Sequence, residues 1–174
     1  MEAPLPPTPP EPARPTGRVA ILGTGNELDG DDGAGILIVR QLAARAVRRP
    51  GVLILEGGSA PENLTGALRR FAPDVVVLVD AADFCDAPGT IAWIPWEDAD
   101  GVSASTHTLP PTLLSRYLRH ELGCQVVLLG IQPASLAFGD PLSAAVAAAV
   151  ENATALLDSW LAGEAAADRP AVTE

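Results

Sequence analysis

Three polar residues at the expected ends of strands could do chemistry in this sequence: Asp32, Asp80 and His107. Asp32 ends an acidic, glycine-rich loop that follows the apolar residues 19–22, and Asp80 follows the apolar run 75–79. His107 lies in a loop rich in serine and threonine. If they converge, two carboxylates and one imidazole make a small site for a divalent metal ion or for acid–base catalysis.

Short runs of β-branched residues alternate with helical patterns, and these elements decide whether the three residues meet. The predicted strands cover residues 18–22, 52–56, 75–80, 90–95 and 125–130, and the predicted helices cover residues 32–47, 61–71, 109–122 and a last stretch that begins near residue 140. This alternation predicts an α/β three-layer sandwich, with a mostly parallel five-stranded sheet and helices on both faces. Right-handed crossovers bring the C-terminal ends of parallel strands to one edge. Asp32, Asp80 and the loop of His107 map to that edge or close to it.

The first and last predicted helices carry further detail. Asp140 and Pro141 predict the start of the last helix, as a cap followed by proline in the first turn. The predicted core-facing residues are Val146, Val150, Leu157 and Leu161 in the last helix, and Ile36, Val39, Ala43 and Ala46 in the first. Arg40, Arg45 and Arg48 lie toward the C-terminal end of the first helix, where the helix dipole favours cations.

The length and composition predict one domain. The chain has 174 residues, 48% of them apolar, which suffices for one buried core. Residues 1–17 hold seven of the 17 prolines and predict a disordered arm, residues 18–162 a single α/β domain, and residues 163–174 a frayed tail. The net charge of −11 excludes nucleic acid as an expected partner, because such a chain repels phosphate.

The two cysteines, Cys85 and Cys124, have no CxxC neighbour that would suggest zinc or redox chemistry. With no signal peptide, they indicate a reducing, cytoplasmic setting. No apolar run approaches the ~20 residues of a membrane span. We therefore expect no membrane association.

Two familiar enzyme sites are disfavoured. Gly23 and Gly25 follow the first strand as in a dinucleotide-binding loop, but Leu28 stands where the third glycine is needed, and the acids of this loop would repel a pyrophosphate. Ser59 lacks histidine and aspartate partners at the spacing of a nucleophile elbow.

The acids and histidines also have structural interpretations. Asp29 or Asp31 could simply cap a helix, and Asp32 could do the same. Asp80 follows a buried strand and must be paired, capped or liganded; it could cap a loop together with Asp83. His120 is expected on a solvated helix face. From the residues alone, a structural role stays open for His107, and the Gly-Gly turn after residue 56 could hold an extended peptide or be only a tight turn.

Five segments, in order along the chain, resemble one family. They are residues 21–33, 56–63, 79–83, 106–110 and 129–133. Together they resemble the nickel–iron hydrogenase maturation endopeptidases over about residues 18 to 160. The resemblance is strongest to the branch that processes the large subunit of formate-hydrogenlyase-type hydrogenase.

The resemblance implies an endopeptidase that removes the C-terminal extension of the hydrogenase large-subunit precursor once nickel has been inserted. The metal-contacting and catalytic positions of the family carry over to Asp32, Asp80 and His107. The cleft-lining positions are Asn26, Glu56, Gly57 and Gly58, with Glu56 where the family usually has aspartate. Nickel is expected from the precursor and not as a permanently bound cofactor, and the enzyme is expected to be a monomer.

The mechanism has open alternatives. The attacking water could be activated by the metal or by one carboxylate as general base. A metallopeptidase that owns its metal is a rival, although HExxH is absent. A non-catalytic checkpoint that binds the nickel-loaded precursor is another.

Overall fold

The computed structural model describes residues 12, 17–45, 49–95 and 111–163. The described strands are β1 Val19–Thr24, β2 Val52–Gly58, β3 Val75–Ala81, β4 Ile91–Pro95 and β5 Gln125–Ile131. The helices are α1 Ala34–Arg45, α2 Thr65–Phe71, α3 Pro111–Leu122 and α4 Ala144–Ala162, with short 3-10 turns η1 Gly30–Gly33 and η2 Pro61–Leu64. His107, most of the proline-rich arm and the tail from residue 164 lie outside the described residues.

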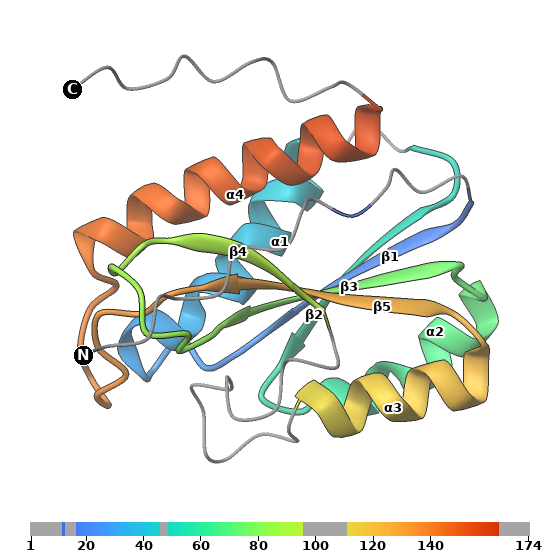
Figure 1. The fold of residues 1–174 in the computed structure, drawn as a ribbon, viewed down its shortest axis with the longest axis horizontal. Helices are drawn as coiled ribbons and strands as arrows, with labels where there is room; N and C mark the ends of the chain where they lie inside the picture. The colour runs from blue at the N-terminus through green and yellow to red at the C-terminus, as the bar shows by residue number, and fades with distance from the viewer. Residues whose placement is uncertain (1–11, 13–16, 46–48, 96–110, 164–174) are drawn as a thin grey trace, which may run out of the picture.

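Within the described residues, five strands form one sheet in the order β2-β1-β3-β5-β4 (Figure 1). The first four strands in this order run parallel, and β4 pairs antiparallel with β5 at the edge. The predicted mostly parallel five-stranded sheet is confirmed. Since β1 and β3 are parallel neighbours, the loops that follow them leave the sheet at the same edge.

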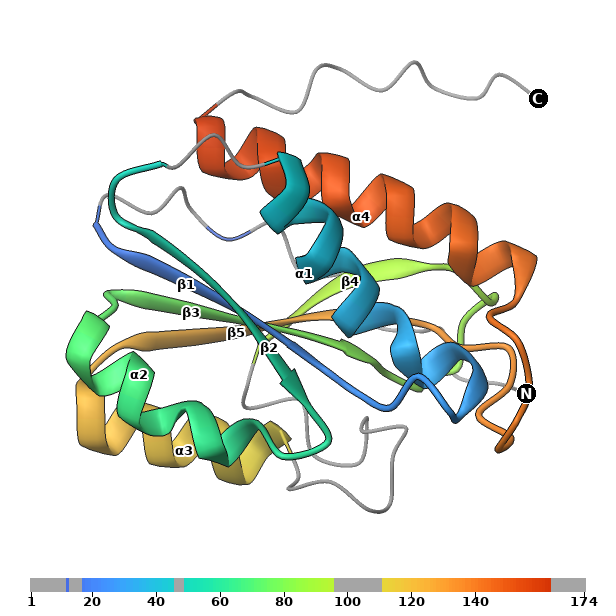
Figure 2. The ribbon, with the colours of Figure 1, turned by 180° about the vertical axis from the view of Figure 1, so that it is seen from behind.

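Helices cover both faces of the sheet (Figures 1 and 2). α1 and α4 pack on one face, and α2 and α3 pack on the other. Side chains of β3 alternate between the two cores: Val77 and Val79 face α1 and α4, while Val76 and Leu78 face the other pair. This double burial explains the continuous apolar run that leads to Asp80.

Glycine allows α1 to start close to the sheet. A Cβ atom on Gly35 would collide with the backbone oxygens of Thr24 and Val79. Thr24 is the last residue of β1, and Val79 lies near the end of β3. Only glycine fits this close approach. The contact brings η1, which carries Asp32, against the C-terminal ends of the two strands.

The start of α4 differs from the prediction. The helix begins at Ala144, and the Ser143 hydroxyl caps it by accepting a hydrogen bond from the Val146 amide. Asp140 instead accepts a hydrogen bond from the Ser135 hydroxyl at 2.6 Å, within the preceding loop. The sequence Asp-Pro therefore marks a turn here, because a loop partner competes with the helix for the carboxylate.

The core-facing prediction is partly correct. In α4, Val146, Val150 and Leu157 are buried and Leu161 packs against them half-buried. In α1, Ile36 and Val39 are buried, but Ala43 is exposed and Ala46 lies outside the described residues. The other core residues of α1 are Ala34, Ile38 and Leu42. Because α1 packs against both the sheet and α4, its buried face is wider than one stripe.

Trp160 joins α4 to the sheet and to the arm. Its ring lies 5.6 Å from the ring of Trp93 on β4, and its indole N–H donates to the carbonyl oxygen of Pro12 at 3.1 Å. Among the described helices, none has the length and apolar character needed to cross a membrane.

Candidate active site

Asp32 and Asp80 meet at the C-terminal edge of the sheet. Asp32 lies in η1, after β1, and Asp80 is the penultimate residue of β3; they are 1% and 5% exposed. Oδ2 of Asp32 accepts the Asn26 amide at 2.8 Å. Oδ1 of Asp32 and Oδ1 of Asp80 are buried and have no hydrogen-bond partner among the described residues. An unpartnered buried carboxylate oxygen is costly, so this pair is built for a proton or a cation.

The electrostatics of the pair agree with its geometry. Burial, and then the charge of Asp32, raise the pKa of Asp80 to about 8, although hydrogen bonds from Thr24 and from the Ala81 amide oppose the change. Burial is also the main cause that raises the pKa of Asp32, with the Asn26 amide opposing and Asp29 adding to it. Both shifts favour a neutral or cation-bound state over two bare charges.

Asp31, the neighbour of Asp32, has a structural role. Its Oδ2 accepts the amides of Ala134 and Ser135 at 2.8 and 3.2 Å, and its Oδ1 accepts the Ser143 amide at 2.7 Å. It thus joins the loop after β1 to the loop after β5.

Asp29 stands at the N-cap position of η1 but makes no capping bond; its carboxylate accepts the side-chain amide of Asn26. The sequence had suggested that Asp29 or Asp31 could cap the helix that follows, but neither carboxylate does so.

Asn26 shapes the loop that carries Asp32. Its backbone amide binds Asp32, its side-chain amide donates to Asp29, and its side-chain oxygen accepts the Leu28 amide. These bonds commit the polar atoms of Asn26 to the loop itself. Its predicted position at the cleft is compatible with this supporting role.

Glu56 is engaged by Arg40 of α1. Arg40 donates from Nε and Nη2 to Glu56 at 2.9 and 2.6 Å, and from Nη1 and Nη2 to Glu27 at 2.6 and 2.9 Å. Arg40 lowers the pKa of Glu56, which therefore stays ionised. Sequence reasoning missed this contact, because the dipole argument considered Arg40 only in relation to its own helix.

The Gly57–Gly58 turn lies directly after Glu56 at the same edge. Gly58 has φ +56°, which favours glycine, and its carbonyl accepts the Gly25 amide at 3.1 Å. This bond ties the turn to the loop after β1. Gly57 and Gly58 therefore lie next to the loop of Asp32, and their place in a cleft stays a prediction.

Asp83, and not Asp80, caps the loop after β3. Asp83 accepts the side-chain amide of Gln132 and the Cys85 amide, and these two hydrogen bonds lower its pKa. The side-chain oxygen of Gln132 accepts the amides of Phe84 and Asp86. Gln132 lies in one of the five segments that resemble the family, residues 129–133. The sequence did not predict that Gln132 fixes the loop after β3, because its partners are mostly backbone amides.

The histidines divide as follows. His120 is exposed on α3 beside Glu121, as predicted. His107 lies outside the described residues, so its place beside Asp32 and Asp80 stays a prediction. The described ranges hold no cluster of three or more potential metal ligands.

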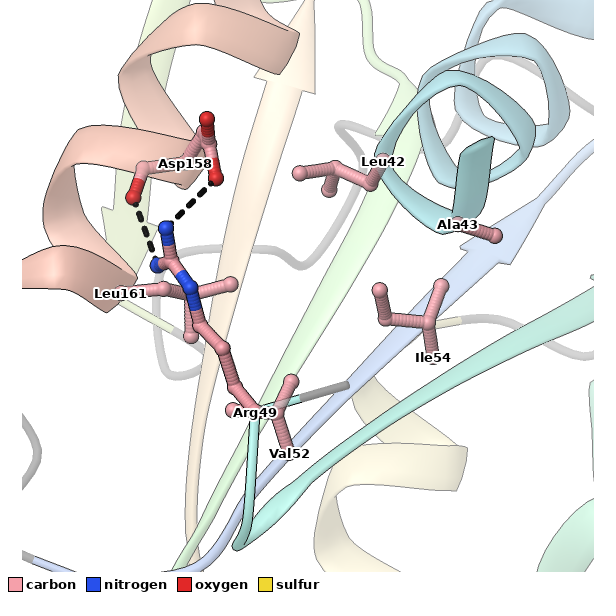
Figure 3. Close-up of a pocket in the computed structure, with 7 residues that line it drawn as sticks. All are labelled: Leu42, Ala43, Arg49, Val52, Ile54, Asp158 and Leu161. Atoms are coloured by element: carbon pink, nitrogen blue, oxygen red, sulfur yellow. Dashed lines mark hydrogen bonds and ion pairs between the residues drawn. The ribbon is translucent and has the colours of Figure 1, made fainter. Parts of the chain in front are cut away.

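Two hollows of the described surface are separate from the carboxylate pair. One, of about 420 Å³, is bounded by the N-terminal half of β2 and the end of α4, where Arg49 binds Asp158 (Figure 3). The other, of about 320 Å³, lies between the first turns of α2 and α3. Neither is lined by Asp32 or Asp80.

Comparisons with known proteins agree with this architecture. The family model described as hydrogenase maturation protease matches residues 36–160. The hydrogenase 3 maturation protease of Escherichia coli (strain K12) is 36% identical over 141 residues, which cover 80% of this chain and 88% of that protein.

Solved structures give the same result. The [NiFe] hydrogenase maturation protease HycI from Thermococcus kodakarensis KOD1 superposes with a TM-score of 0.75 at 34% identity, over 83% of this chain and 92% of that one. The hydrogenase maturating endopeptidase HybD from E. coli superposes with a TM-score of 0.71 at 28% identity, over 84% and 93%. The chain therefore belongs to the hydrogenase maturation protease family, and it is an endopeptidase.

Proposed function

We propose that this endopeptidase removes the C-terminal extension of a nickel-loaded [NiFe]-hydrogenase large-subunit precursor, and that Asp32, Asp80 and His107 contact the nickel of the precursor. The observation that carries this proposal is the pair of buried oxygens, Oδ1 of Asp32 and Oδ1 of Asp80, without partners in the described chain. A cation supplied by the substrate would satisfy both. Carboxylate oxygens and a neutral imidazole suit a borderline divalent ion.

In this proposal nickel is part of the substrate. In the free enzyme the pair holds a proton at neutral pH, because the pKa of Asp80 is raised to about 8. Arrival of the nickel replaces that proton and offsets the repulsion between the two carboxylates. The enzyme therefore has a physical means of distinguishing loaded from unloaded precursor.

Hydrolysis then uses one carboxylate of the pair as general base. Docking aligns the scissile peptide beside the pair, with the Gly57–Gly58 turn as backbone support. One carboxylate accepts a proton from water as the water oxygen bonds to the peptide carbonyl carbon. The same proton passes to the leaving nitrogen as the C–N bond breaks, which yields a new carboxyl terminus and a free amine.

We further propose a cytoplasmic monomer. Both cysteines are free thiols, one exposed and one buried, which suits a reducing compartment. The precursor is the partner that this function requires.

Intact mass of the large-subunit precursor, incubated with the enzyme with and without prior nickel loading, tests the proposal. We expect loss of one C-terminal peptide from the loaded form alone. Cleavage of both forms would instead indicate an enzyme that binds its own metal ion or that needs no metal. Metal analysis of the purified protein distinguishes these two cases. A stable nickel-dependent complex of unchanged mass would contradict processing.

A further inference from the structure

Two large apolar side chains project from the loops around the carboxylate pair. Leu28, in the loop after β1, is 61% exposed, and Phe138, in the loop after β5, is 78% exposed. The Leu28 carbonyl accepts the Gly139 amide at 2.7 Å, so the two loops touch at these residues. Figures 1 and 2 show the two loops side by side at one end of the sheet. We name these two residues the Leu28–Phe138 patch.

The loops that carry the patch are held firmly. Asp31 accepts three amides of the β5–α4 loop and donates its own amide to the Ser135 carbonyl at 2.9 Å. Within that loop the Ser135 hydroxyl donates to Asp140. The patch is thus presented on braced loops, and a partner that binds it does not first have to order them.

The surroundings of the patch are acidic. The loops at this edge, residues 25–33, 56–63, 82–90 and 132–143, contain nine Asp and Glu residues and no Lys or Arg. Arg40, which reaches in from α1, offsets Glu27 and Glu56. The remaining acids leave this edge negative, so it attracts a basic partner and repels an acidic one.

We propose that the Leu28–Phe138 patch is a docking surface for the hydrogenase precursor, and that it takes a segment with apolar side chains flanked by Lys or Arg. This inference rests on the proposed function. A substrate whose peptide reaches Asp32 and Asp80 must approach the edge from which the patch projects. Exposed aromatic and aliphatic groups on a rigid, charged rim are typical of surfaces that bind proteins.

A second copy of this chain fits the patch poorly. In such a dimer, the negatively charged loops of two copies would face each other, and like charges in contact oppose association. A basic, apolar segment satisfies both the charge and the exposed area. The occupant is therefore the substrate and not the enzyme itself.

The test compares the double variant Leu28→Ser/Phe138→Ser with a matched control, Leu113→Ser/Tyr117→Ser. The control removes two other exposed apolar side chains, on α3 beside the hollow between α2 and α3. For each protein, precursor binding is measured without cleavage, and KM and kcat are measured from processing. Tm and molar mass by light scattering report folding and oligomeric state.

We expect the patch variant to bind the precursor about tenfold more weakly and to raise KM by a similar factor, with kcat within about twofold of wild type. Wild-type binding should also weaken as salt rises. The control should match wild type. If the control variant and not the patch variant loses affinity, or if neither does, the docking proposal is overturned and the proposed function stands.

The remaining outcomes are also decisive. A wild-type dimer that the patch variant dissociates would assign the patch to self-association and overturn the proposal. Wild-type protein that binds precursor through the patch but never shortens it would support docking and contradict the proposed processing. Wild-type protein that does not bind the precursor would overturn both.

Discussion

Asp31 holds the loop after β1 to the loop after β5, whereas its neighbour Asp32 shares a buried edge with Asp80. Asp31 accepts three backbone amides, which satisfy both of its oxygens. Asp32 and Asp80 each keep one buried oxygen without a partner in the described chain. The three carboxylates are all buried, but the consequences differ. Hydrogen-bonded acceptors stabilise the fold, whereas acceptors without partners are available to bind a proton or a cation.

The largest expected effect concerns the Asp32–Asp80 pair. Asp80→Asn should lower precursor processing by about a thousandfold, because in the proposed mechanism it removes a group that takes part in proton transfer and contacts the nickel. Asp83→Asn is the matched control: it lies three residues on, caps the loop after β3, and should process normally. Turnover followed by intact mass measures both, with circular dichroism as the check on folding. Normal turnover by folded Asp80→Asn would remove this residue from the mechanism.

The next largest effect concerns the contribution of Asp31 to the stability of the fold. Asp31→Ala leaves three amides without their acceptor and should lower the free energy of unfolding by about 3 kcal/mol. Asp29→Ala should cost much less, because among the described residues the Asp29 carboxylate accepts only the side-chain amide of Asn26. Urea denaturation measures both variants. Equal losses would mean that the loop is held by something other than Asp31.

The contrast between these two neighbours also shows what the sequence alone could predict. The position of Asp32 and Asp80 at one sheet edge followed from strand–helix alternation, which is a local and repeated signal. The role of Asp31 did not, because its partners are backbone amides more than a hundred residues away. No side-chain pattern marks such amides.

Local rules failed elsewhere for the same reason. Asp140 and Pro141 have the composition of a helix start, but the Ser135 hydroxyl binds the carboxylate and the helix begins at Ala144. Arg40 was assigned to a helix dipole, while the fold brings it to Glu27 and Glu56. Tertiary partners decided both cases.

The pH dependence of stability sharpens the comparison. The pKa of Asp80 is about 8 in the folded protein and 3.8 is its ordinary value, so between these values the folded state holds a proton that the unfolded state has released. The free energy of unfolding should therefore fall as pH rises from about 4 to about 8, and this contribution should level off above that. Asp32 contributes in the same direction, because its pKa is also raised.

Asp80→Asn isolates this contribution. The variant should lose most of the decline with pH and should be more stable than wild type near pH 8 by about 1–2 kcal/mol, as expected for a strained functional group. Urea denaturation from pH 4 to pH 9 in metal-free buffer measures it. A wild-type curve that rises over this range would contradict the raised pKa.

The smallest effect separates two roles of one residue. Ser143 gives its backbone amide to Asp31 and its hydroxyl to the cap of α4. Ser143→Ala keeps the amide and removes only the cap, so it should cost about 1 kcal/mol, much less than Asp31→Ala. Ser143→Gly is the control, because glycine is tolerated at this position and should cost only a few tenths of a kcal/mol. Since the contact with Asp31 persists, processing by Ser143→Ala should equal that of wild type at temperatures where both are folded. A loss comparable to that of Asp31→Ala would show that the start of α4, and not the buried carboxylate, braces the loops around the active pair.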